Sequence, residues 1–165
     1  MRLSGVTIRE MRNGEGVVEI VRVPEENEDF LGLVRLLDAE LAIRDGAEHG
    51  FYAQFNKPVD LGGVVVAYLG PEAVGCGAFK RYTDSTAEIK RMFVRPEARG
   101  KRMAAAVLLE LEKWAAESGF RECFLETGFK QPEAIALYKR EGYEVIPNYG
   151  QYAGVENSVC MRKLL

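Results

Sequence analysis

The sequence lacks the residues that several catalytic and binding classes require. It has one histidine, His49, which excludes a histidine-based triad or metal cluster, and we expect no metal. Its three cysteines, Cys76, Cys123 and Cys160, lie far apart with no Cys-x-x-Cys pair, which argues against a disulfide framework or a zinc site. No stretch approaches the roughly 20 apolar residues of a membrane span, and the first ten residues lack a signal-peptide core. We therefore expect a cytoplasmic protein with no membrane partner.

Two common phosphate-binding motifs are also missing. No GxxxxGK[ST] occurs, and no GxGxxG follows an early strand, so the P-loop and Rossmann classes lack their residues. The composition, 47% hydrophobic and 28% charged, is ordinary for a soluble globular protein. A chain of 165 residues is long enough to bury about 68 to 70% of its unfolded surface. We predict a single domain over residues 1–165.

Positive charge is concentrated in residues 90–102, KRMFVRPEARGKR. This segment holds six cations and one acid in a protein whose net charge is −3, so the remainder carries −8. A basic segment in an acidic protein favours a phosphorylated small ligand over nucleic acid, which would require a broad basic face. The apolar run AEIKRMFV before it and MAAAVLLELEKWAA after it indicate a strand, a basic turn and a helix. The start of a helix binds phosphate through unpaired N–H groups, although a run of charges can also be simply a solvated helix start.

The remaining pattern predicts an α/β fold: a mixed, mainly antiparallel twisted sheet of about seven strands flanked by helices. A strand–helix–strand crossover makes 87–94 and 122–127 parallel neighbours. The last strand, if exposed at an edge, would let two subunits pair as a homodimer. The predicted strands are 6–10, 17–22, 63–69, 73–82, 87–94, 122–127, 143–146 and 158–165.

Four helices are expected between these strands. Asp29 is the predicted cap of the first, which ends at Asp45–Gly46 and places Phe30, Val34, Leu37 and Leu41 on one face. A short second helix carries Phe51, Tyr52 and Phe55. The third runs from about Lys101 to Ser118, and the fourth starts at Pro132 with Ile135 and Tyr138 facing inward.

Arg99 to Ala104, RGKRMA, matches the signature Q/R-x-x-G-x-G/A of the GCN5-related N-acetyltransferases. FVRPEARG before it and EAIALYKREGYEV after it also resemble that family in order and spacing, so the resemblance covers roughly residues 60–165. The family most often has glycine where this chain has Arg102. We expect Arg102 to be a helical residue that still donates its N–H to phosphate.

The resemblance implies acetyl-coenzyme A as donor and a sheet split between the family's strands 4 and 5, here 87–94 and 122–127. Backbone groups of the first of these strands would hold the pantetheine and the thioester carbonyl, and the helix start would hold the pyrophosphate. The donor-binding residues implied are Met92, Phe93, Val94, Arg99, Gly100, Lys101, Arg102, Met103, Ala104 and Ala105.

Two residues are implied as catalytic. Tyr138 matches the tyrosine that protonates the departing thiolate, and Glu88 matches the general-base glutamate of the histone-acetylating branch. Alternatively, Tyr138 is a core aromatic and Glu88 a polar strand residue about 13 Å from Met92. Glu126 is a second candidate base or substrate contact, with a structural salt bridge as its alternative. Tyr149 and Tyr152, in the long loop 147–157, are candidate substrate contacts or packing residues.

We therefore predict an N-acetyltransferase that moves the acetyl group directly to a small-molecule or peptide amine in a ternary complex, without a cysteine nucleophile. Two alternatives remain open. One is a non-catalytic acyl-CoA-binding or sensing module. The other is a nucleotide-binding regulatory domain that uses the same basic turn. We expect no nucleic-acid partner.

Overall fold

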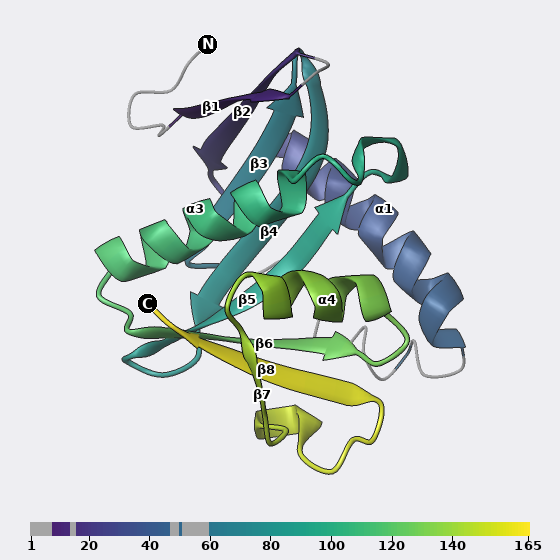
Figure 1. Ribbon diagram of the computed structural model, residues 1–165, viewed down its shortest axis with the longest axis vertical. Coiled ribbons are helices and arrows are strands. Elements are labelled where there is room, and N and C mark those ends of the chain that lie inside the picture. The colour runs from purple at the N-terminus through teal and green to yellow at the C-terminus, as the bar shows by residue number, and fades with distance from the viewer. Residues whose placement is uncertain (1–7, 14–15, 47–49, 51–59) are drawn as a thin grey trace.

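The computed structural model describes residues 8–13, 16–46, 50 and 60–165 as a sheet with helices on both faces (Figure 1). The short helix expected around residues 51–55, and His49, lie outside the described residues. The strands are β1 (Ile8–Asn13), β2 (Gly16–Val23), β3 (Gly63–Leu69), β4 (Glu72–Arg81), β5 (Thr86–Val94), β6 (Glu122–Gly128), β7 (Glu144–Ile146) and β8 (Ser158–Leu164). The helices are α1 (Glu28–Asp45), α3 (Met103–Glu117) and α4 (Pro132–Arg140), with short 3-10 helices η2 (Pro96–Ala98) and η3 (Gly150–Tyr152).

The described strands form one sheet in the order β1-β2-β3-β4-β5-β6-β8-β7. Every neighbouring pair is antiparallel except β5 and β6, which are parallel and are connected through α3. The predicted mixed α/β fold is confirmed. No described helix is both long and apolar enough to cross a membrane.

The middle of the sheet is covered on both faces. Along β3, Val64 and Val66 belong to the cluster that packs against α1, whereas Val65 and Ala67 belong to the cluster that packs against α3. Successive strand residues point to opposite faces, so an unbroken apolar run such as GVVVAYL is what a strand buried on both sides requires. In Figure 1, α3 and α4 lie in front of the sheet and α1 lies behind it.

The cap of α1 is Asn27, so the prediction of Asp29 was wrong. The Asn27 side chain accepts a hydrogen bond from the Phe30 N–H at 3.0 Å. Asp29 lies in the first turn, where its carboxylate instead accepts a hydrogen bond from the Tyr68 hydroxyl at 2.7 Å. Asparagine caps a helix as well as aspartate does, so the sequence alone did not separate the two positions. The buried face consists of Phe30, Leu33, Val34 and Leu37, with Leu41 partly buried.

α3 begins at Met103, two residues later than predicted. Gly100 and Arg102 both have positive φ angles, 80° and 64°, so neither is helical. The expectation that Arg102 is a helical residue was therefore wrong: it is a left-handed residue directly before the helix, with ψ 19°. Residues with a Cβ disfavour this conformation by about 1–2 kcal/mol, which gives a physical reason for the family's glycine at this position.

β8 is an internal strand, so the expectation of an exposed last strand was wrong. It pairs with β6 on one side and with β7 on the other, because the short β7 adds outside it. The outer strands of the described sheet are β1 and β7. The association of two subunits remains a prediction, but an exposed edge of β8 no longer supports it.

Candidate active site

β5 separates from β6 about halfway along its length. Four pairs join Thr86–Ile89 to Glu122–Leu125. Beyond them, β6 continues beside β8 to Gly128, and β5 continues beside β4 to Val94. The split expected between these two strands is therefore present, and it leaves the end of β5 with a strand on one side only.

A bulge in β5 lies where the strands part. The register of β4 with β5 shifts between Cys76 and Ala78, and Arg91 has a φ of 58°. A bulge bends its strand and increases its twist, which turns the end of β5 away from β6. The Arg91 side chain is 1% exposed and forms an ion pair with Asp38 of α1. This contact anchors the bulge to the helix behind the sheet.

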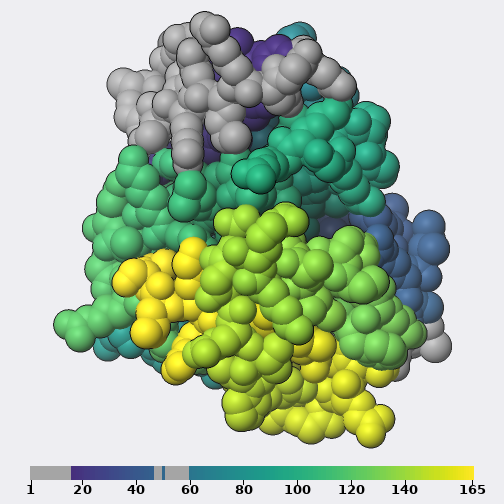
Figure 2. Space-filling model, in the orientation of Figure 1, coloured from purple at the N-terminus to yellow at the C-terminus, as the bar shows by residue number. Residues whose placement is uncertain are grey.

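A cavity of about 420 Å³ lies beside the end of β5, bounded by the start of α3 and by α1 and α4. Of the residues predicted to bind the donor, Lys101 does not line it. The others do: Met92, Phe93, Val94, Arg99, Gly100, Arg102, Met103, Ala104 and Ala105. Figure 2 shows α4 and the chain after it, yellow-green to yellow, forming much of the surface below α3.

The start of α3 presents unpaired N–H groups at this cavity. The first hydrogen bond of the helix runs from the Ala106 N–H to the Arg102 carbonyl at 3.1 Å. The N–H groups of residues 103–105 precede it and have no partner within the helix. No side chain caps this end, and no acid lies in the first turn. A bound anion would therefore meet backbone donors without a competing carboxylate in that turn.

Arg99 is already engaged in the described structure. Its Nε donates to the Val94 carbonyl at 2.9 Å, and one terminal nitrogen lies 3.0 and 2.9 Å from the two carboxylate oxygens of Glu40 on α1. Arg44, also on α1, forms an ion pair with Glu133 at the start of α4. These contacts connect α1 to both walls of the cavity.

A second cavity of about 120 Å³ adjoins the first. Both are lined by Met92 and Tyr138, so they meet at the end of β5. The smaller cavity is also lined by Glu88, Glu126 and Tyr152, three residues singled out from the sequence. Tyr149 is not among its lining residues, and Glu156 is an exposed residue of the loop.

Both oxygens of Glu88 have partners. The Tyr149 hydroxyl donates to one of them at 2.6 Å, and Lys90 Nζ lies 3.5 Å from the other. The Glu88 side chain is 2% exposed, and the Tyr149 ring packs against Phe124 with centroids 5.0 Å apart. Tyr149 thus packs against Phe124 and donates a hydrogen bond to Glu88, while a contact of Tyr149 with the substrate remains a prediction.

Glu126 has a different environment. One of its carboxylate oxygens is buried and lacks a hydrogen-bond partner among the described residues. Burial raises its pKa to about 7, partly offset by a hydrogen bond from the Ser158 side chain and by the charge of Lys90. A carboxylate with a pKa near the working pH is suited to general-base catalysis.

Tyr138 lies between the two cavities. It is 7% exposed, and burial together with the nearby charge of Glu126 raises its pKa. The hydroxyl is therefore protonated at neutral pH, as a proton donor to a departing thiolate must be.

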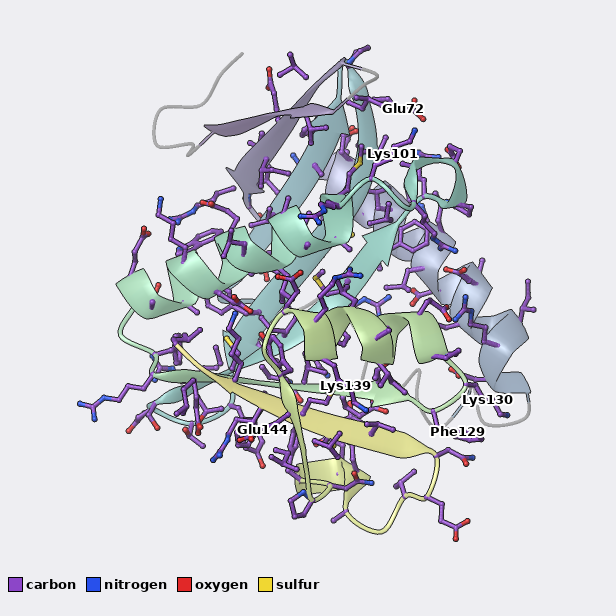
Figure 3. All side chains as sticks on the ribbon, in the orientation of Figure 1. Glu72, Lys101, Phe129, Lys130, Lys139 and Glu144 are labelled. Atoms are coloured by element: carbon purple, nitrogen blue, oxygen red, sulfur yellow. The ribbon has the colours of Figure 1, made fainter. Side chains whose placement is uncertain are left out.

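Lys90, Asp45 and Gln131 also line the smaller cavity and were not predicted as site residues. Lys90 was the easiest to find, since it lies two residues after Glu88 and a strand places alternate residues on one face. Asp45 lies at the end of a helix far away in sequence, and nothing in the sequence indicated its position. Lys130, after β6, and Lys139, on α4, are exposed and line neither cavity (Figure 3).

Comparisons with known proteins agree with this geometry. The model of the acetyltransferase (GNAT) family matches residues 33–143. An IAA acetyltransferase of Azospirillum brasilense is 37% identical over 102 residues, which is 61% of this chain and 67% of the relative.

Two crystal structures have the same fold. A Klebsiella pneumoniae protein described as an acyl-CoA N-acyltransferase is 30% identical, with a TM-score of 0.76 over 90% of this chain and 97% of that one. A PaiA N-acetyltransferase of Thermoplasma acidophilum, solved with coenzyme A, is 19% identical, with a TM-score of 0.67 over 90% and 99%. The chain thus belongs to the acetyltransferase (GNAT) family and is an acetyl-CoA-dependent N-acetyltransferase.

Proposed function

We propose that the protein transfers the acetyl group of acetyl-coenzyme A directly to a primary amine while both substrates are bound. The observation that carries this proposal is the meeting of the two cavities at Met92 and Tyr138. The larger cavity has room for an extended donor beside the free side of β5, and the smaller one has room for the amine.

The donor would be held mainly by backbone groups. Amides of residues 103–105 face the place where a pyrophosphate would lie, and the free side of β5 at residues 92–94 offers strand-like hydrogen bonds to a pantetheine amide. A backbone N–H beside Met92 would also stabilise negative charge on the thioester oxygen during attack.

The cysteines are unsuited to a covalent acetyl intermediate. All three are buried and free, and none lines either cavity. Burial raises the pKa of Cys76 and of Cys123 to about 12 and that of Cys160 to about 11. A thiol that stays protonated is a poor nucleophile, which favours direct transfer.

We assign the general base to Glu126 rather than to Glu88. Glu126 lines the cavity and has one oxygen without a hydrogen-bond partner among the described residues, whereas both oxygens of Glu88 are engaged. In the reaction, the amine proton passes to Glu126, the nitrogen–carbon bond forms, the carbon–sulfur bond breaks, and Tyr138 donates its proton to the departing sulfur. The acceptor would enter the smaller cavity as the free amine, whose nitrogen lone pair attacks the thioester carbon.

The decisive experiment compares Glu126→Gln, Glu88→Gln and Tyr138→Phe in a thiol-release assay with a panel of amines. We expect kcat to fall about 100-fold or more for Glu126→Gln and Tyr138→Phe, and less than tenfold for Glu88→Gln. Lys139→Met, an exposed change on α4, is the matched control.

A large loss of kcat with Glu88→Gln and none with Glu126→Gln would identify Glu88 as the general base. Acetylated protein isolated in the absence of an amine, and competent to pass its acetyl group on, would contradict direct transfer. Tight donor binding with no thiol release for any amine would favour the alternative of an acyl-CoA-binding module.

A further inference from the structure

Three ionisable side chains lie side by side where β5 and β6 separate. Ile89 pairs with Leu125, so Lys90 and Glu126 are the first residues beyond the last pair. Glu88, two residues before Lys90, lies on the same face of β5. All three line the smaller cavity. None of the steps proposed above uses Lys90.

Lys90 is held in place by buried contacts. Its side chain is 7% exposed, and its Nζ lies 3.5 Å from the Glu88 carboxylate. Glu88 is itself fixed by the Tyr149 hydroxyl at 2.6 Å, and Tyr149 packs against Phe124, which lies two residues before Glu126 on β6. Tyr149, Glu88 and Lys90 are therefore linked by successive contacts beside Glu126.

The charges that face Glu126 come from every element around it. Lys90 on β5 lowers its pKa, whereas Glu88 on β5 and Asp45 on α1 raise it. Ser158 on β8 contributes a hydrogen bond, and Tyr138 on α4 and Tyr152 on η3 lie near its charge. Among these groups, Lys90 is the one cation, so its loss would leave Glu126 among carboxylates and phenols.

We propose that Lys90 and Glu88 are positioning residues that set the charge state of Glu126 with opposite signs. The inference rests on the proposed function, in which Glu126 accepts the amine proton. Lys90 keeps Glu126 ionised and ready to accept that proton, and Glu88 holds the lysine in place while making Glu126 a stronger base. The sequence pattern Glu88-Ile89-Lys90 then acts on the reaction through Glu126 and not by accepting or donating a proton itself.

The test measures the titration of Glu126 directly. Carbon NMR of protein labelled at the glutamate carboxyl carbons gives its midpoint, with Glu126→Gln to assign the signal. We expect Lys90→Met to move that midpoint up by about one pH unit and Glu88→Gln to move it down by about half a unit. The acid limb of the pH profile of kcat/KM should move in the same two directions.

Controls separate electrostatics from misfolding. Lys139→Met removes one exposed positive charge from α4 and should leave both the titration and the pH profile in place. Circular dichroism and calorimetric donor binding show that each variant is folded. If Lys90→Met does not fold, Glu88→Gln alone still tests the direction in which the Glu126 titration midpoint moves.

The outcomes distinguish the two proposals. A Glu126 titration that stays in place in the folded variants, or moves in the same direction in both, would overturn this inference and leave the proposed function standing. A titration that moves as expected while the acid limb does not follow would show that Glu126 is not the base. That result would overturn the proposed function and, with it, the catalytic role of Lys90.

Discussion

Replacing Arg102 by glycine should make the protein more stable. Arg102 has a φ of 64° and a ψ of 19°, a left-handed conformation that costs a residue with a Cβ about 1–2 kcal/mol. Glycine avoids that cost, but its greater conformational entropy stabilises the unfolded chain by about 0.4–1 kcal/mol. The difference favours glycine by about 0.8 kcal/mol, which corresponds to about 2 °C in Tm for a chain of this size.

Urea unfolding and scanning calorimetry of Arg102→Gly and Arg102→Ala test this reasoning. Alanine removes the charge but keeps the Cβ, so Arg102→Ala should remain close to the wild type. An alanine variant as stable as the glycine variant would show that charge, and not backbone strain, is responsible. A glycine variant less stable than the wild type would refute the argument outright.

Arg91 shows why the side chain must be considered together with the backbone angle. Its φ of 58° resembles that of Arg102, but its side chain is buried and paired with Asp38. Arg91→Gly would relieve the same strain while leaving Asp38 without its partner and a void at the bulge. We therefore expect a net loss of stability at Arg91 and a net gain at Arg102.

Three further predictions concern single contacts. Asn27→Ala should lower the free energy of unfolding by about 1 kcal/mol in urea titrations, because the cap to the Phe30 N–H is lost. Burial raises the pKa of Glu126 to about 7 in the folded state, so ionisation of this carboxyl opposes folding. Glu126→Gln should therefore be more stable than the wild type by on the order of 2 kcal/mol above pH 7. This difference in the free energy of unfolding should disappear below about pH 4.5, where Glu126 is protonated in both the folded and the unfolded state. Glu40→Gln should tighten donor binding about threefold by calorimetry, because the Glu40 carboxylate is ion-paired with Arg99 in the free protein and competes with the donor for it. Weaker binding would instead show that Glu40 holds Arg99 in the position that binds the donor.

Much of the fold was predictable because its central strands are buried on both faces. Unbroken apolar runs such as 63–69, separated by short turns, leave few alternatives to an antiparallel meander. The start of α3 was less predictable, since Lys101 and Arg102 are acceptable helix formers by composition. Their turn is determined by two positive φ angles, at residues 100 and 102, and only the family's glycine indicated it.

The site was predictable where backbone does the binding and less so where charges interact. All of the residues expected at the donor cavity except Lys101 line it, because they come from two short segments, a strand end and the helix start that follows it. Glu88 and Glu126 were both candidates from the sequence, but what distinguishes them is which oxygens have partners. Tyr149 and Lys90, which engage Glu88, are 61 and 2 residues away, and only the folded chain brings Tyr149 to it.

The basic segment 90–102 has a different role from the one its composition suggests. Several of its cations are paired with acids outside the segment: Lys90 with Glu88, Arg91 with Asp38, Arg95 with Glu72 and Arg99 with Glu40. These pairs fix the bulge, the split and the cavity walls, and they neutralise most of the charge that a ligand would otherwise meet. Donor affinity should therefore depend on the backbone N–H groups of residues 103–105 more than on side-chain charge. A weak dependence of donor affinity on salt would follow, because paired charges release few counterions when a phosphate binds.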